Sequence, residues 1–428
     1  MFKLSDFGVT RNTATLSNGM RVVTFERAGM PLYIEALFFA GSCFDPSGKE
    51  GAAHFTEHVI CSTTKKFPKR ETMATFIEGF GGGTNAYTSS DVLGIESWVG
   101  DPVDLPVAVE TITERIENPL INSNEVENER KVIHDEIGRY ITKPDRYLPF
   151  LWNELIYRGH PSSHSVLGSH KSLDAVTTSD IKKYHQDLLL RGHAVVVASG
   201  GIKIADVCRE LEAKLTTNFS KNLDIPQTFN PTRDRFVLTR RYAGTDRVYF
   251  NLGFPGCPKD HEDKVALDLT ADVIAGGMSS ILMKRLRLER GLVYGVGAFN
   301  VSSIDRGSWG IGTSCVKDKF DEVIGIVIEE IDNLYNGKID QDRLQLIKNH
   351  SVKAVRFDVQ TSESWVSRSS FVELFYPDRD MSLPQYLNEE SKVTLDDIKR
   401  VAKKYLQPGQ WYFAATGDIK ESDIKIDY

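Results

Sequence analysis

The 428-residue chain has few of the features that mark membrane, secreted or nucleic-acid-binding proteins. Its apolar runs, such as 36–40 and 194–198, are far shorter than the ~20 residues of a membrane-spanning helix. Basic side chains (52) do not outnumber acidic ones (59), and the net charge of −7 disfavours nucleic acid and anionic membranes as partners. No apolar signal segment follows the first methionine. We therefore expect neither a membrane nor a nucleic-acid partner.

Cysteine is also scarce. The five cysteines are scattered, odd in number and contain no CxxC pair, which favours reduced thiols in a cytoplasmic protein and disfavours a cysteine-bound zinc. The glycines at 81–83 are not followed by a GxxxxGK[ST] sequence, so nucleotide binding is not expected.

An internal repeat is present. Residues 176–202 and 393–419 align without a gap at an offset of 217, with ten of 27 positions identical. Each segment reads as a capped helix, a glycine turn and a buried strand. The sequence predicts an α+β protein of two homologous domains from an internal duplication, each a mostly antiparallel sheet packed with helices. We expect domains at 1–220 and 234–428, joined by the polar, proline-containing linker 221–233.

The most informative segment is 54–58, His-Phe-Thr-Glu-His, within a predicted helix. His54, Glu57 and His58 share one face of that helix. Two neutral imidazoles four residues apart can bind one divalent cation, and the neighbouring carboxylate can accept a proton from water. The alternative is a polar cluster at the surface or at a helix end.

A catalytic zinc usually has three protein ligands, so a further histidine or carboxylate is expected. Glu129 and Glu136 lie seven residues apart and share a face of a second predicted helix. The alternative is a solvated acidic face, because several carboxylates crowd this segment. His134 is expected on a different face, and His160, His164 and His170 lack helical spacing.

At this point the chain resembles the pitrilysin/insulinase-type zinc metallopeptidases, which include the mitochondrial processing peptidases. HFTEH matches their inverted motif HxxEH, and Glu129 to Glu136 matches their downstream ExxxxxxE pair. The resemblance extends along the chain through LSNGMRV, GSCFDPSGKEGAAH, GGTNAYTS, the loop 159–168 and LRLERGLVY. The chain departs from the family pattern at Thr56, 61–64, Leu93 and Ile95, and none of these changes removes a catalytic group.

The resemblance implies one Zn²⁺ per chain, with His54, His58 and Glu136 as its ligands, and Glu57 as general base. Glu129 would orient a ligand from behind.

The resemblance also implies that Arg290 and Tyr294, from the second half, reach the substrate or the tetrahedral intermediate. The second half has Ala271 and Ala275 at the positions equivalent to His54 and His58, so only the first half should bind metal.

The strand containing Asn85, Ala86, Tyr87 and Thr88 is a candidate sheet edge that binds an extended peptide substrate through main-chain hydrogen bonds. The resemblance implies a chamber of four related domains, hence a homodimer or a heterodimer with a related subunit. The predicted activity is a zinc endopeptidase acting on short or unfolded peptides. The alternatives are a non-catalytic or structural subunit, and a dedicated maturation peptidase for one ribosomal peptide.

Overall fold

The computed structural model describes residues 1–190, 192–220 and 226–425, which form two compact units. Of the described residues, the first unit comprises 1–137, 165–190, 192–220 and 354–386, and the second comprises 138–164, 226–353 and 387–425. No helix in the described part of the chain has both the length and the apolar composition needed to cross a bilayer. The first residues of the expected linker, 221–225, lie outside the described residues, so the division expected at 221–233 stays a prediction.

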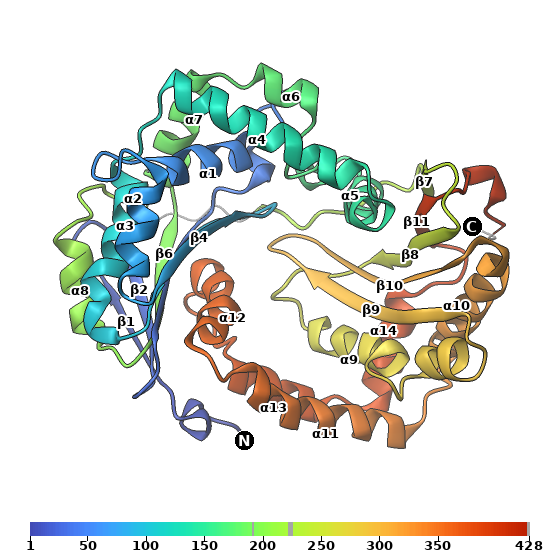
Figure 1. The fold of residues 1–428 in the computed structure, drawn as a ribbon. Helices are drawn as coiled ribbons and strands as arrows, with labels where there is room; N and C mark the ends of the chain where they lie inside the picture. Colours follow the sequence, from blue (N-terminus) through green and yellow to red (C-terminus); the bar gives the residue numbers. More distant parts are fainter. Residues whose placement is uncertain (191, 221–225, 426–428) are drawn as a thin grey trace. The chain divides into compact units, whose positions relative to one another are not determined.

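The first unit is built on a six-stranded sheet (Figure 1). Its strands, in spatial order, are β1 (Thr10–Thr15), β2 (Arg21–Glu26), β6 (Ala194–Gly200), β3 (Leu32–Phe38), β5 (Leu93–Val99) and β4 (Gly83–Thr88). The pair β2–β6 is parallel and all other pairs are antiparallel. The β1–β2 turn contains the predicted Asn18-Gly19 hairpin signal, and Gly19 takes the positive φ of 89° that favours glycine.

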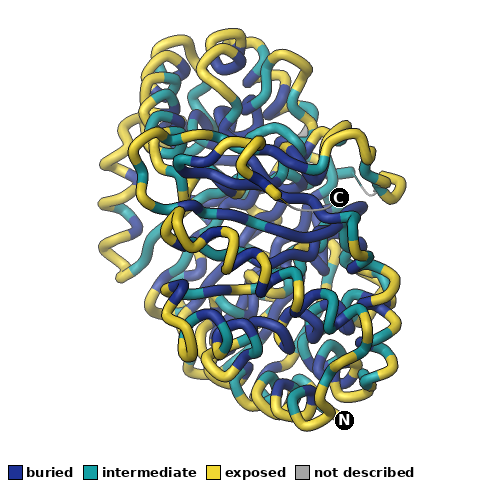
Figure 2. Tube along the Cα trace, turned by 90° about the vertical axis from the view of Figure 1, so that its right-hand side faces the viewer, coloured by how far each residue is buried: buried dark blue, intermediate teal, exposed yellow. Residues whose placement is uncertain are grey.

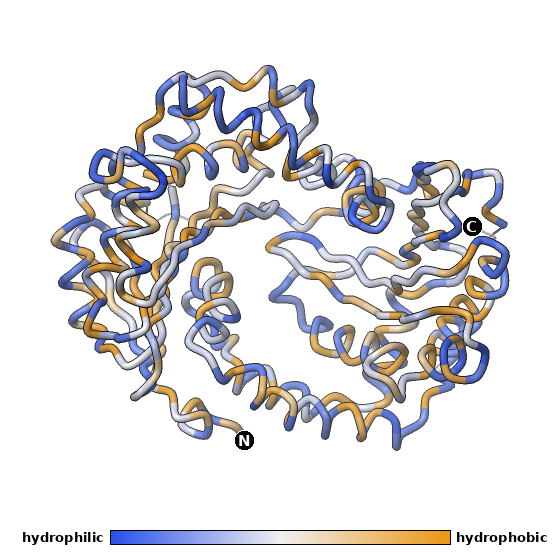
Figure 3. The backbone as a smooth tube through the Cα atoms, viewed as in Figure 1, coloured by the Kyte–Doolittle hydropathy of each residue, from blue (hydrophilic) through white to orange (hydrophobic). Residues whose placement is uncertain are grey.

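Helices cover both faces of this sheet, and its inner strands β2, β6, β3 and β5 are mostly buried, whereas the outer strands β1 and β4 are more exposed (Figure 2). One face carries α1 (Ala52–Ser62), α2 (Arg70–Glu78), α3 (Leu105–Glu117) and α8 (Ile204–Glu212), and the other carries α12 (Ser362–Phe375). The remaining helices of the first unit are α4 (Ser123–Ile141), α6 (His170–Ala175) and α7 (Thr178–Tyr184). Helix α4 is largely hydrophilic (Figure 3), and its few buried side chains are Val126, Glu129, Ile133 and Ile137.

The second unit repeats this topology. Its five strands lie in the order β7 (Val237–Arg241), β11 (Tyr412–Gly417), β8 (Arg247–Pro255), β10 (Gly307–Val316) and β9 (Val293–Ser302). This is the order and direction of the last five strands of the first sheet, with β7–β11 the parallel pair. The predicted fold class is confirmed: two α+β domains, each with a mostly antiparallel sheet packed with helices.

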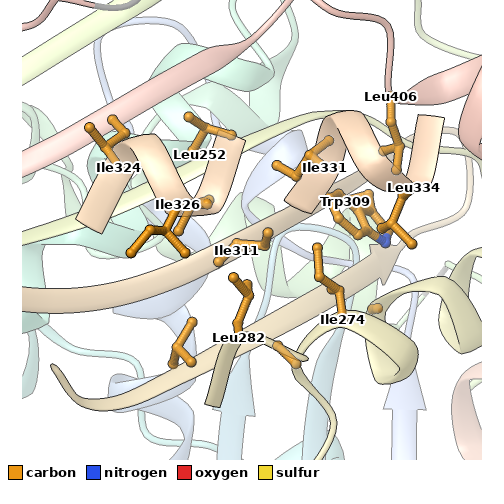
Figure 4. Packing of buried hydrophobic residues seen from close by; sticks show 14 of the residues in the cluster. Leu252, Ile274, Leu282, Trp309, Ile311, Ile324, Ile326, Ile331, Leu334 and Leu406 are labelled. Carbon is orange, nitrogen blue, oxygen red and sulfur yellow. The ribbon is translucent and has the colours of Figure 1, made fainter. Parts of the chain in front are cut away.

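The helices of the second unit also cover both faces of its sheet. Its main core combines side chains from β8 and β10 with α9 (Lys264–Ala275), α10 (Phe320–Tyr335) and α14 (Leu395–Tyr405) (Figure 4). The other face is covered by α5 (Pro144–Ile156), whose Leu151 and Trp152 pack with Tyr412. The remaining helices are α11 (Gln341–Asp358) and α13 (Leu383–Lys392).

The two halves of the sequence exchange one helix. Helix α5 comes from the first half and packs on the second sheet, whereas α12 comes from the second half and packs on the first. Their starts, Pro144 and Ser362, are close to the 217-residue offset of the repeat. The same offset relates Gly200 and Gly417, which end β6 and β11 with φ of 141° and 134°. The compact units are therefore not continuous halves of the sequence.

We predict that Glu373 anchors α12 to the first sheet. Its carboxylate accepts hydrogen bonds from Arg11 Nε at 2.6 Å and from Arg21 Nη2 at 2.8 Å. Glu373→Gln should lower the free energy of unfolding by about 1–3 kcal/mol, because both arginines lose their ionised partner. The loss stays moderate because both arginines are partly exposed to water. Urea denaturation followed by circular dichroism measures the change.

The matched control is Glu363→Gln, at an exposed position in the same helix, which should change stability by less than about 0.5 kcal/mol. Equal effects of the two substitutions would contradict the anchoring role.

Candidate metal centre

Helix α1 carries the HxxEH segment, and a loop carboxylate fixes its start. Asp45 accepts hydrogen bonds from the backbone N–H groups of Gly51 and Ala53, each at 2.7 Å. A negative charge at this end also interacts favourably with the helix dipole. Gly51 has φ 97°, and a side chain there would approach Leu167 O to 2.7 Å, so glycine is required. The start of α1, and with it the position of the HxxEH segment, is therefore fixed by Asp45 and Gly51, independently of any metal.

The structure brings His54, His58 and Glu136 together, and their ligand atoms lie within 4.8 Å of one another. His54 Nε2 and His58 Nε2 are 3.8 and 3.7 Å from the same Glu136 Oε2. These distances are too long for hydrogen bonds. They are close to the roughly 3.3 Å expected between two ligands of one tetrahedral zinc with metal–ligand bonds near 2.0–2.1 Å. The three donors therefore fit a zinc ion.

Both imidazoles are held in the neutral form that binds metal. Burial, and then the neighbouring His58, lower the pKa of His54 to about 3. Burial also lowers the pKa of His58. His54 Nδ1 is buried and has no hydrogen-bond partner among the described residues. Uncharged nitrogen donors and one carboxylate suit zinc better than a hard cation such as calcium.

Glu129 is one of the few buried residues of α4, and it contacts His58 on the side away from Glu136. Its Oε2 is 3.2 Å from His58 Nδ1, the ring nitrogen that does not face Glu136. Its other oxygen pairs with Arg70. A carboxylate on the far nitrogen of a histidine fixes the ring orientation and tautomer. The orienting role that the resemblance implies for Glu129 stays a prediction, which this contact with His58 makes testable.

Glu57 is buried beside the candidate ligands without being one of them. The hydroxyl of Thr88 donates a hydrogen bond of 2.7 Å to Glu57 Oε2. Burial raises the pKa of Glu57, and the Thr88 hydrogen bond opposes this rise. A carboxylate with increased proton affinity, next to a metal site, is suited to accept a proton from water.

Residues 85–88 lie in β4, which is the edge strand of the first sheet as the sequence predicted. Side chains alternate along a strand, so Ala86 and Thr88 face the side of α1 while Asn85 and Tyr87 face the other. Tyr87 donates a hydrogen bond of 2.6 Å to the buried Glu35, whose pKa burial raises to about 7. Thr88 therefore has a contact with Glu57 that sequence reasoning did not foresee.

Arg290 and Tyr294 belong to the second unit. Tyr294 is the second residue of β9 (Val293–Ser302) and is 81% exposed. The guanidinium of Arg287 lies 4.9 Å from its ring. Arg290 Nη1 donates to Glu322 at 3.3 Å. Both side chains are accessible within their own unit, and their proposed role at the substrate stays a prediction.

The other histidines named from the sequence take local roles. His134 contacts His170 through Nδ1 at 2.5 Å and Asp174 through Nε2 at 2.9 Å. His160 Nε2 is 3.0 Å from Asp305, in the second unit. Within the described residues, the one group of three or more potential ligands that could hold a metal is His54, His58 and Glu136.

A cavity of about 350 Å³ adjoins the centre on the side of α2 and β4. Its lining comprises Glu57, His58, Cys61, Ser62, Arg70, Met73, Ala74, Thr84, Asn85, Ala86, Arg115, Glu129 and Val132. The buried Arg115 of α3 was not predicted, because a single arginine in an amphipathic helix carries no sequence signal. Asp45 was also missed, although an aspartate shortly before a predicted helix is a recognisable capping signal.

Comparison with known proteins agrees with this geometry. Residues 29–170 match the family described as insulinase (peptidase family M16), and residues 175–350 match the peptidase M16 inactive domain. A protein of Streptomyces coelicolor named as an uncharacterized zinc protease is 26% identical over 411 residues, covering 93% of this chain and 88% of the relative. A Bacillus subtilis protein with the same description is 24% identical over 394 residues, covering 91% and 94%.

Two solved structures share the fold. A protease from Helicobacter pylori has a TM-score of 0.85 at 22% identity, covering 95% of this chain and 99% of that one. A chain in the structure of complex III2 from Candida albicans with Inz-5 bound has a TM-score of 0.83 at 17% identity, covering 97% of both. The chain thus has the fold of two-domain M16-type proteins, and it carries a candidate metal centre at His54, His58 and Glu136. The chain belongs to the insulinase family, peptidase family M16.

We predict a graded loss of zinc affinity across the two α4 carboxylates. Glu136→Gln should weaken zinc binding by more than about 100-fold, because it removes a ligand, whereas Glu129→Gln should weaken it by about 10- to 100-fold through His58. Competition with a chromogenic chelator measures both affinities. The reverse order would assign the third ligand to Glu129.

Proposed function

We propose that the chain is a zinc-dependent endopeptidase that hydrolyses peptide bonds in short or unfolded peptides. The observation that carries this proposal is the convergence of His54, His58 and Glu136 beside Glu57, a buried carboxylate with raised proton affinity. The relatives named as zinc proteases support it.

The chemistry divides between the metal and the chain. When bound, zinc supplies the Lewis acidity that polarises a peptide carbonyl and makes water a stronger acid. Glu57 accepts the proton of the attacking water and transfers it to the leaving amine. The Thr88 hydroxyl holds Glu57 Oε2, so that the carboxylate keeps a fixed orientation during both transfers.

The substrate would bind as an extended strand on β4. The main-chain groups of residues 85–88 on the free side of the edge strand are suited to pair with a peptide backbone. Because these contacts are made by the main chain, they select extended peptides over folded proteins. We assign Asn85, Ala86, Tyr87 and Thr88 to substrate binding on this basis.

We further propose that Arg290 and Tyr294 contact the peptide or stabilise its oxyanion. Tyr294 is exposed and its hydroxyl is a good hydrogen-bond donor. The proposal includes a cytoplasmic homodimer, or a heterodimer with a related subunit, that encloses the peptide.

A second candidate is a non-catalytic subunit, favoured by the fold shared with a chain of complex III2. A scaffold has no need for three converging ligand atoms and a buried base, so the intact centre supports the peptidase.

We predict that Glu57→Gln retains zinc but lowers kcat on a quenched fluorescent peptide by about 10²- to 10⁴-fold, because the general base is lost. Metal analysis and steady-state kinetics on the same sample measure both properties. Glu78→Gln, at an exposed position in α2, is the control and should leave both unchanged. Wild-type turnover by Glu57→Gln would rule out the assigned base.

We predict that Thr88→Val shifts the acidic limb of the kcat/KM profile to higher pH. Activity requires ionised Glu57, so it falls as pH drops through the pKa of Glu57. The Thr88 hydrogen bond lowers that pKa, and its removal raises it further.

Thr13→Val, at an exposed position in β1, is the matched control. A limb that stays in place, or moves to lower pH, would show that the Thr88 contact does not set the ionisation of Glu57.

A further inference from the structure

The cavity beside the metal centre contains a buried guanidinium that no described carboxylate contacts directly, although its charge lowers the pKa of Glu57 in the same lining. Arg115 is 7% exposed. Its Nη1 donates to Thr84 Oγ1 at 2.5 Å and to the backbone oxygen of Asn85 at 3.5 Å. Both acceptors are neutral. Within the described residues Arg115 forms no ion pair, and its Nε is buried without a hydrogen-bond partner.

The unused donors lie on one edge of the guanidinium group. All hydrogen bonds of Arg115 to the described residues involve Nη1, which leaves Nε and Nη2. Nε is buried, whereas Nη2 is not, so Nη2 is the donor that a carboxylate entering the cavity can reach, through a charge-assisted hydrogen bond. Leaving such a charge buried and unpaired is costly, so a partner that supplies a carboxylate would be stabilised.

The other charged groups of the cavity are already paired. Arg70 forms its ion pair with Glu129, which in turn contacts His58. Glu57 accepts a hydrogen bond from Thr88. Arg115 is thus the cation of this lining that remains available to a ligand. Glu57, His58 and residues 84–86 of β4 all line the cavity, so a group in it belongs to a residue close to the scissile bond.

We propose that Arg115 is a specificity-determining residue that binds an aspartate or glutamate side chain of the peptide substrate near the cleaved bond. This inference rests on the proposed peptidase function and names a substrate class for it: peptides with an acidic residue close to the cleavage site. The side chain of that residue enters the cavity while the peptide backbone pairs with β4.

The test uses the full zinc-loaded chain and matched peptides. Glutamate and glutamine are exchanged at each position around the cleaved bond of one good substrate, and kcat/KM is measured for each pair. At one position glutamate should be favoured by about tenfold or more, the worth of a charge-assisted hydrogen bond. Arg115→Gln should reduce this ratio to about one, and Arg115→Lys should retain part of it because charge remains without the planar fork.

Arg70→Gln, measured at saturating zinc, is the control within the same cavity and should keep the ratio. Three results would overturn the inference: no glutamate preference at any position in the wild type, an equal loss for both peptides in Arg115→Gln, or loss of the ratio in Arg70→Gln. An equal loss would show that Arg115 only supports β4 or the charge of Glu57. A chain that cleaves no peptide would overturn both the peptidase function and this inference.

Discussion

The site depends on one constraint: two imidazoles, one helical turn apart, must stay uncharged against a carboxylate on a second helix, with His54 buried and His58 half-buried. His54 and His58 direct their Nε2 atoms at the same oxygen of Glu136, at distances too long for hydrogen bonds. Polar atoms buried without partners are costly, and a shared cation removes that cost. Several other contacts of the first unit serve to hold α1 and α4 in this relation.

Several contacts maintain the relation between α1 and α4. Glu129 of α4 contacts the His58 ring. Arg130, the next residue, places its guanidinium 5.1 Å from the ring of Phe55 in α1 and donates to Val176 O at 2.8 Å. At the other end Asp45 fixes the start of α1. Ligand geometry is therefore built by the protein on regular helices, which is the arrangement that gives precise sites.

The features of the fold and the site that repeat at a regular spacing in the sequence could be predicted from it. The spacing of His54, Glu57 and His58 gives one helical face, and the seven-residue spacing of Glu129 and Glu136 gives another. The 217-residue offset predicted two related units, and the two sheets share their strand order.

Contacts between distant segments could not be predicted in this way. Helix α12 (Ser362–Phe375), from the second half of the sequence, covers one face of the first sheet. Thr88 of β4 donates a hydrogen bond to Glu57 of α1, 31 residues earlier in the chain. Arg115 carries no sequence signal, because what distinguishes it is its burial without a directly bonded carboxylate, and neither property is set by its neighbours along the chain. Such pairings depend on tertiary packing, which a one-dimensional pattern does not encode.

The central claim is that one zinc ion is held by His54, His58 and Glu136. Anomalous diffraction at the zinc absorption edge, from crystals of the full chain grown with one equivalent of zinc, tests it directly. The account predicts a single strong peak within about 2.0–2.2 Å of His54 Nε2, His58 Nε2 and a Glu136 oxygen. A peak at another set of side chains, or no peak in crystals shown to contain zinc at this stoichiometry, would contradict it.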